Sequence, residues 1–487
     1  MDRGHVVTGM ECDVVVLGTG PAGMAAVAAA AAEGVDVVAV EAMDHIGGNC
    51  VWSTGYLTFV NSAMQAEQGL VDDVETFVAD AARMTAEAAE GYGMVVDEDL
   101  VRLFGRESAE TYDILTSRGV RFSRFIPRPR QHTVDRMAAV VDPWMFSAAF
   151  EPDFALPNVR TLFGTTARRL LTEDGRVTGV LVDGPGGTTA ITARGGVVLA
   201  TGGYQSNPEL RQRYQPNFLA RGPYLGVDTC RGDGHLMGQA VGGDLVNMTF
   251  VPPLVIVSSS LVEDAIAVNE SGERFHDEAG VYEERVVALL AQPGRRGWYV
   301  VDDVVAREKA TLIGQMPEPA VQAPTLAALA DTIGVPAAAL EATVAGWNSF
   351  LGTEQTRDPQ TGRVVMPPGR RTCATAPFTA IPMVVGVNFV SGGFRATQSL
   401  QVIDVFGAPT PGLYAAGDCL GGLGGTAELG GTRISGGFTL GRLAGRAAAR
   451  GDADTTVRHS VQGAFLPSKL DTKIALVSLD DHSLDQR

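Results

Sequence analysis

Three things are scarce in this sequence, and each scarcity excludes a class of protein. The five cysteines are widely spread and never occur as a C-x-x-C pair, so we expect reduced thiols and a cytoplasmic location. No uncharged apolar run approaches the ~20 residues that a membrane-spanning helix needs, and residues 1–10 lack the apolar core of a signal peptide. Basic side chains number 38 against 56 acidic ones, and the net charge of −18 argues against nucleic acids and anionic membranes as partners.

What the sequence has in quantity is length, apolar residues and glycine. Its 487 residues are enough for two or three domains, and 45% apolar with 19% charged residues is typical of a soluble globular protein. The 59 glycines fit a backbone that lies close to an extended cofactor, although glycine-rich loops alone would look similar.

The glycines are placed most informatively in residues 13–41, DVVVLGTGPAGMAAVAAAAAEGVDVVAVE. A β-branched run precedes a G-x-G-x-x-G turn, an alanine-rich helix follows, and a second apolar run ends in the acid Glu41. In this order the turn lets the backbone approach a pyrophosphate, the helix N-terminus faces the phosphates, and the acid accepts hydrogen bonds from ribose hydroxyls. We therefore expect a dinucleotide site, with a glycine-rich turn of another α/β fold as the alternative. The residues expected to form it are Gly18, Gly20, Pro21, Ala22, Gly23, Glu41 and Ala42.

The loop after Glu41 narrows this prediction. Gly47-Gly48-Asn49 and the small polar Ser53 and Thr54 resemble the loop beside pyrophosphate and flavin in the fumarate reductase and succinate dehydrogenase flavoprotein superfamily. The succinate dehydrogenases carry the flavin covalently on a histidine of this loop, where the present sequence has Asn49-Cys50-Val51. The resemblance therefore implies non-covalent FAD.

Three further segments resemble the superfamily in the same order along the chain: ATGG at 200–203, RGDG at 231–234 and AAGD at 415–418. A helix expected to begin near Arg433 would turn its N-terminus toward the N1/C2-carbonyl edge of the flavin, where it stabilises negative charge on reduced flavin. The further residues that the resemblance assigns to the cofactor are Gly48, Asn49, Ser53, Thr54, Ala167, Ala200, Thr201, Gly202, Asp233, Gly417, Asp418, Ile434 and Ser435.

The resemblance spans residues 11 to 450 and implies an α/β fold, in which a Rossmann-like FAD-binding domain of glutathione reductase type carries an inserted α+β capping domain. Amphipathic helices at 72–85 and 97–118 and a small β-meander from 159 to 195 are expected in the first part. We expect the FAD-binding domain at 11–247 and 379–450, the capping domain at 248–378, and a polar tail at 451–487.

The chemistry follows from the single dinucleotide motif, because flavoproteins that take hydride from NAD(P)H usually carry a second one. Members of this superfamily move hydrogen across a C–C bond next to a carbonyl or carboxylate, with hydride at flavin N5 and a protein group moving the proton. The resemblance thus implies an FAD-dependent dehydrogenase or reductase of a small organic substrate, with a separate electron donor or acceptor. A flavin monooxygenase and a redox-neutral lyase or isomerase remain the alternatives.

The catalytic prediction rests on the segment NESGERFHDE at 269–278. Aligned on the superfamily's cap, it puts Tyr282 where the fumarate reductases have an arginine proton donor, with Arg285 one turn further on. A phenol of pKa ~10 needs a neighbouring cation to act as a base, and Arg285 or Arg433 would supply it. A packed cap tyrosine is the alternative for Tyr282.

The predicted substrate contacts depart from the fumarate reductases. Their HTxGG segment reads Phe389-Val390-Ser391-Gly392-Gly393 here, and their arginine before LGGN becomes Glu428. These changes make simple fumarate or succinate chemistry doubtful, and the nearest likeness is to 3-ketosteroid and tricarballylate dehydrogenases. We expect Tyr56 and Phe389 either to line the substrate pocket or to be ordinary aromatic residues of the core. The candidate substrate residues are Tyr56, Phe389, Ser391 and Glu428.

Residues 118–136 carry six arginines, of which Arg118 is the first, and one histidine. This is unusual in so acidic a chain. One interpretation is a patch that draws an anionic substrate to the cleft. We favour the other, a solvated loop paired with surface acids, because charge runs usually face water. We also expect His276 to be a surface or hydrogen-bonded residue with Arg274 and Asp277 paired beside it. The histidines lack ligand-like spacing, so no metal is predicted.

Overall fold

The computed structural model describes residues 9–88, 95–215, 222–249, 254–256, 259–280, 282–423 and 429–451. The predicted tail therefore lies outside the described residues apart from Gly451. Among the helices that these ranges contain, none has the length and apolar character that crossing a bilayer requires.

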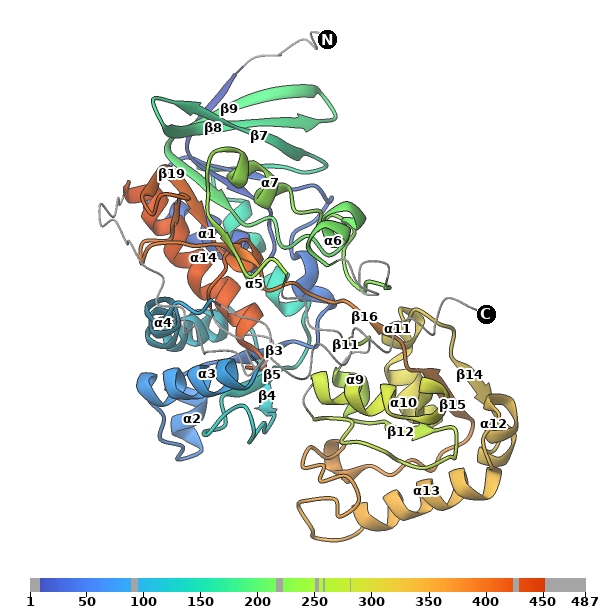
Figure 1. The fold of residues 1–487 in the computed structure, drawn as a ribbon. Coiled ribbons are helices and arrows are strands. Elements are labelled where there is room, and N and C mark those ends of the chain that lie inside the picture. The colour runs from blue at the N-terminus through green and yellow to red at the C-terminus, as the bar shows by residue number, and fades with distance from the viewer. Residues whose placement is uncertain are drawn as a thin grey trace, which may run out of the picture.

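A central sheet of parallel strands carries the fold (Figure 1). Its spatial order is β18-β19-β9-β1-β2-β6, and only β18 runs antiparallel to its neighbour on this path. The inner strands contain buried apolar runs, as parallel strands covered on both faces must, whereas the edge strand β6 is only partly buried. Their bounds are β1 Met10–Leu17, β2 Val37–Val40, β6 Val159–Leu162, β9 Gly187–Leu199, β18 Gln401–Ile403 and β19 Pro409–Ala415.

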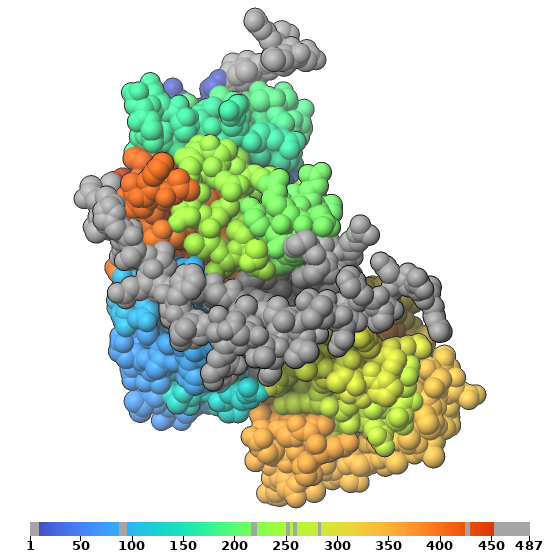
Figure 2. Space-filling view, in the orientation of Figure 1, coloured from blue at the N-terminus to red at the C-terminus, as the bar shows by residue number. Residues whose placement is uncertain are grey.

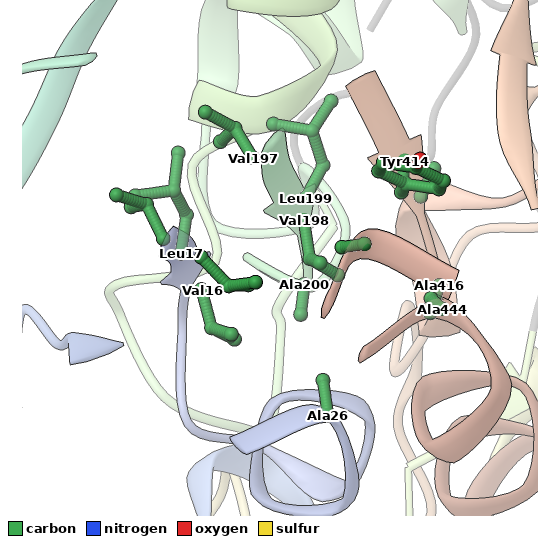
Figure 3. Close-up of a cluster of buried hydrophobic side chains, with 14 of the residues drawn as sticks. Val16, Leu17, Ala26, Val197, Val198, Leu199, Ala200, Tyr414, Ala416 and Ala444 are labelled. Atoms are coloured by element: carbon green, nitrogen blue, oxygen red, sulfur yellow. The ribbon is translucent and has the colours of Figure 1, made fainter. Parts of the chain in front are cut away.

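Two helices packed against each other cover one face of this sheet. They are α1 (Pro21–Ala32), which begins at the glycine turn, and α14 (Thr432–Arg450), which comes from the far end of the chain. Added Cβ atoms at Gly441 and Gly445 would lie 2.2 Å from the carbonyl oxygens of Ala22 and Ala26, so only glycines allow this approach. Figure 3 shows Ala26 of α1 and Ala444 of α14 beside side chains of β1, β9 and β19. Small residues thus join the two ends of the chain into one core.

A β-meander extends the sheet: β7 (Thr166–Glu173) pairs in antiparallel fashion with β8 (Arg176–Gly184), and β8 pairs in antiparallel fashion with β9. The sequence predicted a meander that began at Val159, and this is wrong for its first strand. Residues 159–162 form β6, which lies parallel to β2 at the edge of the central sheet. The alternating pattern of a short edge strand does not distinguish the two pairings.

The residues between β2 and β6 along the chain form a second, smaller sheet and several helices. A three-stranded sheet, β3-β5-β4, stands beside helices α3 and α4, and both predicted amphipathic helices are present there with shifted ends. The bounds are β3 Tyr56–Thr58, α2 Ala63–Glu67, α3 Val74–Ala88, α4 Glu98–Ser117, β4 Phe122–Phe125, β5 Met137–Val140 and α5 Met145–Phe154.

The cap is a separate lobe with its own sheet, β12-β13-β15-β14 (Figures 1 and 2). Apolar residues of α12 and α13 cover one face of this sheet, and residues of α9 and α10 contribute to a cluster on its other side. The cap elements are β12 Ile266–Asn269, α9 Tyr282–Leu290, β13 Gly297–Val301, α10 Asp303–Glu308, α11 Ala310–Gly314, β14 Val321–Ala323, α12 Leu326–Ile333, α13 Ala337–Leu351 and β15 Phe378–Pro382. The precise domain boundaries stay a prediction.

Shorter elements join the cap to the rest of the chain. Two small antiparallel pairs, β10 with β17 and β11 with β16, flank the connections in both directions. The bounds are α6 Pro208–Tyr214, α7 Asp233–Ala240, β10 Leu245–Val246, β11 Leu254–Val255, α8 Ser259–Val262, β16 Val385–Gly386 and β17 Gly393–Phe394.

Candidate active site

A cavity of about 740 Å³ opens at the carboxyl ends of the parallel strands. This is where open α/β sheets place their ligands, because the loops that follow the strands diverge there. Its wall combines the turn after β1, the loop after β2, the N-terminal end of α14 and residues of the cap. The volume is in the range of cofactor sites, and the length of the wall suits an extended ligand.

The glycine turn after β1 has the geometry of a phosphate cradle. Gly18 has φ +91°, and a Cβ there would lie 2.4 Å from the carbonyl oxygen of Ala200. A Cβ at Gly23 would lie 1.9 Å from the oxygen of Gly18, whereas one at Gly20 would meet no atom closer than 4.0 Å. Gly20 therefore leaves the backbone open to the cavity. The N-terminus of α1 has no side-chain cap, so its amide groups are available to an anion.

The acid at the end of β2 is held at the cavity wall by the glycine turn. The Glu41 carboxylate accepts hydrogen bonds from Thr19 N at 2.8 Å, Thr19 Oγ1 at 2.7 Å and Met43 N at 2.9 Å. The sequence predicted ribose hydroxyls as its partners. In the structure Glu41 orders the turn itself, and its contact with a ribose stays a prediction. Nothing in the sequence pattern indicated Thr19 as a partner.

The loop that carries Asn49 is tied to a segment that sequence reasoning missed. Asn49 Nδ2 donates to Tyr224 Oη at 3.0 Å, and Asn49 Oδ1 accepts from Val227 N at 2.8 Å. Burial raises the pKa of the Cys230 thiol to about 12 and raises that of the Tyr224 phenol as well, so both groups stay neutral. No motif marks residues 224–230, because their role comes from Asn49 across the cavity.

The N-terminal turn of α14 brings several predicted residues together around Arg433. Arg433 Nη2 donates to Ser391 Oγ at 2.6 Å, and Nη1 donates to Val390 O at 2.7 Å and lies 3.3 Å from Asp418 Oδ1. The guanidinium carbon lies 4.0 Å from the centroid of the Phe389 ring. These contacts fix a cation on the cavity wall, beside the helix N-terminus that was predicted to face the flavin.

The cap closes the same cavity with mainly apolar side chains. Neither its short helix α11 nor β11 carries a recognisable motif, so the sequence did not indicate them as site elements. Residues of β11, of α11 and of the turn after α11 become part of the wall only through the tertiary fold. The residues concerned are Leu254, Val255, Leu312, Gln315 and Met316.

Most predicted cofactor residues line the cavity, and the exceptions have clear places. Gly23 and Ser435 do not line it; Gly23 packs against Gly18, and Ser435 Oγ donates to Gly431 O at 2.9 Å. The predicted residues on the wall are Gly18, Gly20, Pro21, Ala22, Glu41, Ala42, Gly48, Asn49, Ser53, Thr54, Tyr56, Ala167, Ala200, Thr201, Gly202, Asp233, Phe389, Gly417, Asp418, Arg433 and Ile434.

The remaining catalytic candidates are placed less directly. Tyr282 begins α9, but its side chain is not part of what the structure describes. Glu428 lies outside the described residues. Arg285 is 1% exposed, donates to Gly280 O at 2.9 Å and is not among the residues that line the cavity. Ser391 is not among the residues that line the cavity, and it is linked to the site by the hydrogen bond that it accepts from Arg433. Their roles stay predictions.

The favoured interpretation of residues 118–136 as a solvated loop is wrong for its most buried members. Arg136 is fully buried and donates to Asp72 at 2.7 Å and to Asp80 at 2.6 Å. His132 is also buried and lies 3.1 Å from Gly430 O. Residues 122–125 of the segment form β4 and Arg136 directly precedes β5, so its charges build an internal network as well as a surface.

The expected pairing around His276 is also wrong in one respect. Arg274 pairs with Glu278 at 2.8 Å and with Asp358 at 2.9 Å, rather than with Asp277. His276 itself is 9% exposed and lies 2.9 Å from the carbonyl oxygen of Asp277, as a hydrogen-bonded residue. The Arg274 guanidinium also stacks over Trp347, so this network holds the cap together.

A parallel sheet, an uncapped glycine turn, an acid after the second strand and a capped cavity define a dinucleotide-binding flavoprotein. A family model described as an FAD binding domain matches residues 13–434, and the chain belongs to this family; its cofactor is FAD. With the likenesses below, it is an FAD-dependent oxidoreductase of the fumarate reductase and succinate dehydrogenase flavoprotein superfamily that acts on C–C bonds.

Curated relatives are similar over nearly the whole chain. A probable fumarate reductase of Shewanella frigidimarina is 28% identical over 457 residues, which are 90% of this chain and 74% of that protein. The urocanate reductase of Eggerthella lenta is also 28% identical and covers 90% of this chain and 75% of its own length.

Solved structures of the same superfamily are also similar to this chain. The open conformation of a flavocytochrome c3 fumarate reductase has a TM-score of 0.71 at 27% identity, over 91% of this chain and 79% of that one. The 3-ketosteroid-delta4-(5alpha)-dehydrogenase from Rhodococcus jostii RHA1 has a TM-score of 0.64 at 26% identity, over 90% and 97%.

Proposed function

We propose that this chain adds or removes two hydrogen atoms across a C–C bond next to the carbonyl or carboxylate of a small, largely apolar substrate. FAD, when bound, supplies the two-electron exchange at its N5 atom. The observation that carries the proposal is that one cavity joins the phosphate cradle at Gly20 to a cap-lined compartment at Arg433. Cofactor and substrate can therefore meet there away from bulk water.

The charge and polarity of the compartment support this substrate class. Arg433 is the one Lys, Arg or His side chain on the cavity wall among the residues that the structure describes, and Asp418 and Ser391 already contact it. The cap contributes Leu312 and Met316 to the wall, which also includes Phe389. A dianion would need more than one cation in a partly desolvated site, whereas an apolar substrate with a single oxygen function matches these groups.

The protein's own residues have distinct parts in the proposed reaction. Arg433 and the N-terminus of α14 hold negative charge that develops at the flavin or on the substrate. Tyr282 remains the proposed proton-transfer group at the neighbouring carbon, with Arg285 close to it in sequence. A Tyr282→Phe enzyme with wild-type rates of flavin reduction would remove that assignment.

We further propose that FAD is held non-covalently and that a separate donor or acceptor closes the cycle. The absence of histidine from Asn49-Cys50-Val51 supports the first point. A cytoplasmic location is supported by five free, buried cysteines.

Anaerobic mixing tests this function. Oxidised holoenzyme is mixed with saturated ketones, acids and steroids, and reduced holoenzyme with the matching α,β-unsaturated compounds, while flavin absorbance is followed. We expect one monofunctional apolar compound to bleach or restore the flavin, and Arg433→Leu to slow that step about 10²–10³-fold. The matched control is Arg395→Leu, since Arg395 pairs with Asp244 at 2.9 Å and is not on the cavity wall. No change of absorbance with any pair would contradict the proposal.

A further inference from the structure

Several buried polar atoms without a hydrogen-bond partner belong to residues that line this one cavity. They are the hydroxyl of Tyr56, both amide atoms of Gln205 and the Oδ1 atom of Asn388. A buried polar group without a partner costs free energy, so such atoms mark places where a ligand completes the hydrogen bonding. The FAD-binding part of the chain supplies all three, opposite the apolar residues of the cap.

Tyr56 has the most restricted position of the three. The residue is 5% exposed and its ring packs with Ile126, Met137, Ala279 and Val365. These neighbours come from both parts of the chain, because Ala279 and Val365 belong to the cap. The ring is thus held where the cap meets the FAD-binding part, and its buried hydroxyl has no hydrogen-bond partner there.

The strand that carries Tyr56 directs it toward the N-terminus of α14. Side chains two apart on a strand point to the same face, so Tyr56 and Thr58 of β3 share one face. Thr58 Oγ1 donates to Gly430 O at 2.6 Å, and Thr58 N donates to Gly431 O at 3.1 Å. Gly430 and Gly431 lead into the helix that bears Arg433. Tyr56 therefore stands on the same side of the cavity as the loop that presents the cation.

We propose that the Tyr56 hydroxyl donates a hydrogen bond to the substrate's carbonyl or carboxylate oxygen, which makes Tyr56 a catalytic residue of the reaction proposed above. The inference rests on that proposed function. A hydroxyl clamped by apolar side chains has few competing partners, so it is preorganised for an oxygen on which charge develops. Arg433 then serves the flavin side and Tyr56 the substrate oxygen.

In the proposed reaction Tyr56 donates a hydrogen bond and keeps its proton, and the atoms and electrons balance without it. In the reducing direction the β carbon of the unsaturated substrate gains hydride, and the C=C pair moves so that negative charge develops on the carbonyl oxygen. Tyr56 O–H stabilises this enolate through its hydrogen bond. A proton then arrives at the α carbon from the proton-transfer group, the C=O bond is restored, and Tyr56 is unchanged.

Substituted phenols test this role without turnover, because a phenolate imitates an enolate. The holoenzyme is titrated with 4-methylphenol, 4-chlorophenol and 4-cyanophenol, and binding is followed by the change in flavin absorbance. For wild type we expect tighter binding as the phenol becomes more acidic. For Tyr56→Phe, which keeps the ring, we expect binding of 4-cyanophenol to weaken about tenfold or more and the substrate-dependent flavin step to slow about 10²–10³-fold.

The matched control is Tyr299→Phe. The Tyr299 hydroxyl is also buried without a partner, but Tyr299 lies in the cap sheet and not on the cavity wall. We expect this variant to bind phenols as wild type does. FAD affinity and thermal stability are measured for all three proteins, and we expect Tyr56→Phe to leave both near the wild-type values.

Three results would overturn the proposal. One is unchanged phenol binding and an unchanged flavin step in Tyr56→Phe. Another is loss of FAD or a shifted flavin spectrum in that variant with phenol binding intact, which would make Tyr56 a cofactor ligand. The third is a wild-type holoenzyme that binds none of the phenols. If Tyr56→Phe loses phenol binding but no carbon substrate alters the flavin, the donor role stands and the proposed function fails.

Discussion

Single glycines decide whether the cofactor site forms at all. We expect Gly23→Ala to reduce FAD affinity by at least about 100-fold, because its Cβ would lie 1.9 Å from Gly18 O and would push α1 away from β1. Fluorescence titration of the apoprotein with FAD measures this. Gly346→Ala is the control, since its Cβ meets no atom within 4 Å and it lies within α13, where alanine is favoured over glycine. Equal FAD affinity in both variants would count against the cradle.

One buried histidine should make stability depend on pH. Burial, helped by Arg136, lowers the pKa of His132 to about 4 from its usual 6.5, so the folded state resists its protonation. Stability due to neutral His132 is therefore complete above about pH 6.5 and is lost as the pH falls toward 4, by about 3 kcal/mol in all.

We expect His132→Gln to flatten this part of the curve. The measurement is the difference in unfolding free energy between variant and wild type at several pH values from 7 to 4, because acidic groups also titrate at the low end. His45→Gln is the control, as the His45 side chain is 38% exposed. A difference that stays constant with pH would show that His132 does not contribute this dependence.

Among single residues, the sequence predicted those whose role follows from their own chemistry and from their neighbours in the chain. Gly18, Gly20 and Asp418 were predicted because a turn or a cofactor constrains them locally. Tyr224 and Gln315 were not, since they reach the cavity only through the fold and belong to no motif. Arg274 was paired wrongly because Asp358, its distant partner in sequence, is adjacent only in space.

At the scale of elements, the segment between β4 and β5 depends on one internal ion pair network. We expect Arg136→Met to destabilise the fold by about 3–5 kcal/mol, because the buried Asp72 would lose the Arg136 cation and Asp80 would keep only the partly exposed Arg83. Urea unfolding measures it. The control is Arg121→Met, at an exposed position directly before β4, for which we expect a change below about 0.5 kcal/mol. A small effect of Arg136→Met would mean that water already reaches the two carboxylates.

Helices and buried strands were predictable because their apolar spacing is periodic. Segments 118–136 and 159–162 were not. A run of arginines looks the same in sequence whether it faces water or buried aspartates, and Asp72 and Asp80 come from another part of the chain. Likewise β6 has too few residues to show whether it joins a meander or the edge of a parallel sheet.

For the whole molecule, the contacts between the cap and the rest of the chain set how the cavity closes. Arg124 of β4 donates to Glu263 at 2.6 Å, next to the cap sheet, and Arg130 pairs with Glu284 of the cap helix α9. The basic segment 118–136 therefore attaches the cap rather than forming only a surface patch.

We expect Arg124→Ala to speed amide hydrogen exchange several-fold in 122–125 and 261–269, because the charged hydrogen bond between the two parts is lost. FAD affinity should change little, since the cradle lies elsewhere. Arg168→Ala is the control, as Arg168 pairs with Asp183 on the exposed meander. Exchange rates that match wild type in both segments would argue against Arg124 as a link to the cap.

The fold class and the cofactor of the whole molecule were predictable because one family of motifs runs through most of the chain. The substrate was not, because the cap residues on the cavity wall, Leu312 and Met316 among them, belong to no motif. The central claim is therefore that hydrogen moves across a C–C bond, and product analysis in D₂O tests it most directly. Reduced holoenzyme and the active unsaturated compound are mixed anaerobically, and the product is examined by mass spectrometry and NMR. The account predicts a product with two more hydrogens on adjacent carbons, with solvent deuterium on the α carbon. A product that gains oxygen, or an isomer with no change in hydrogen content, would contradict it.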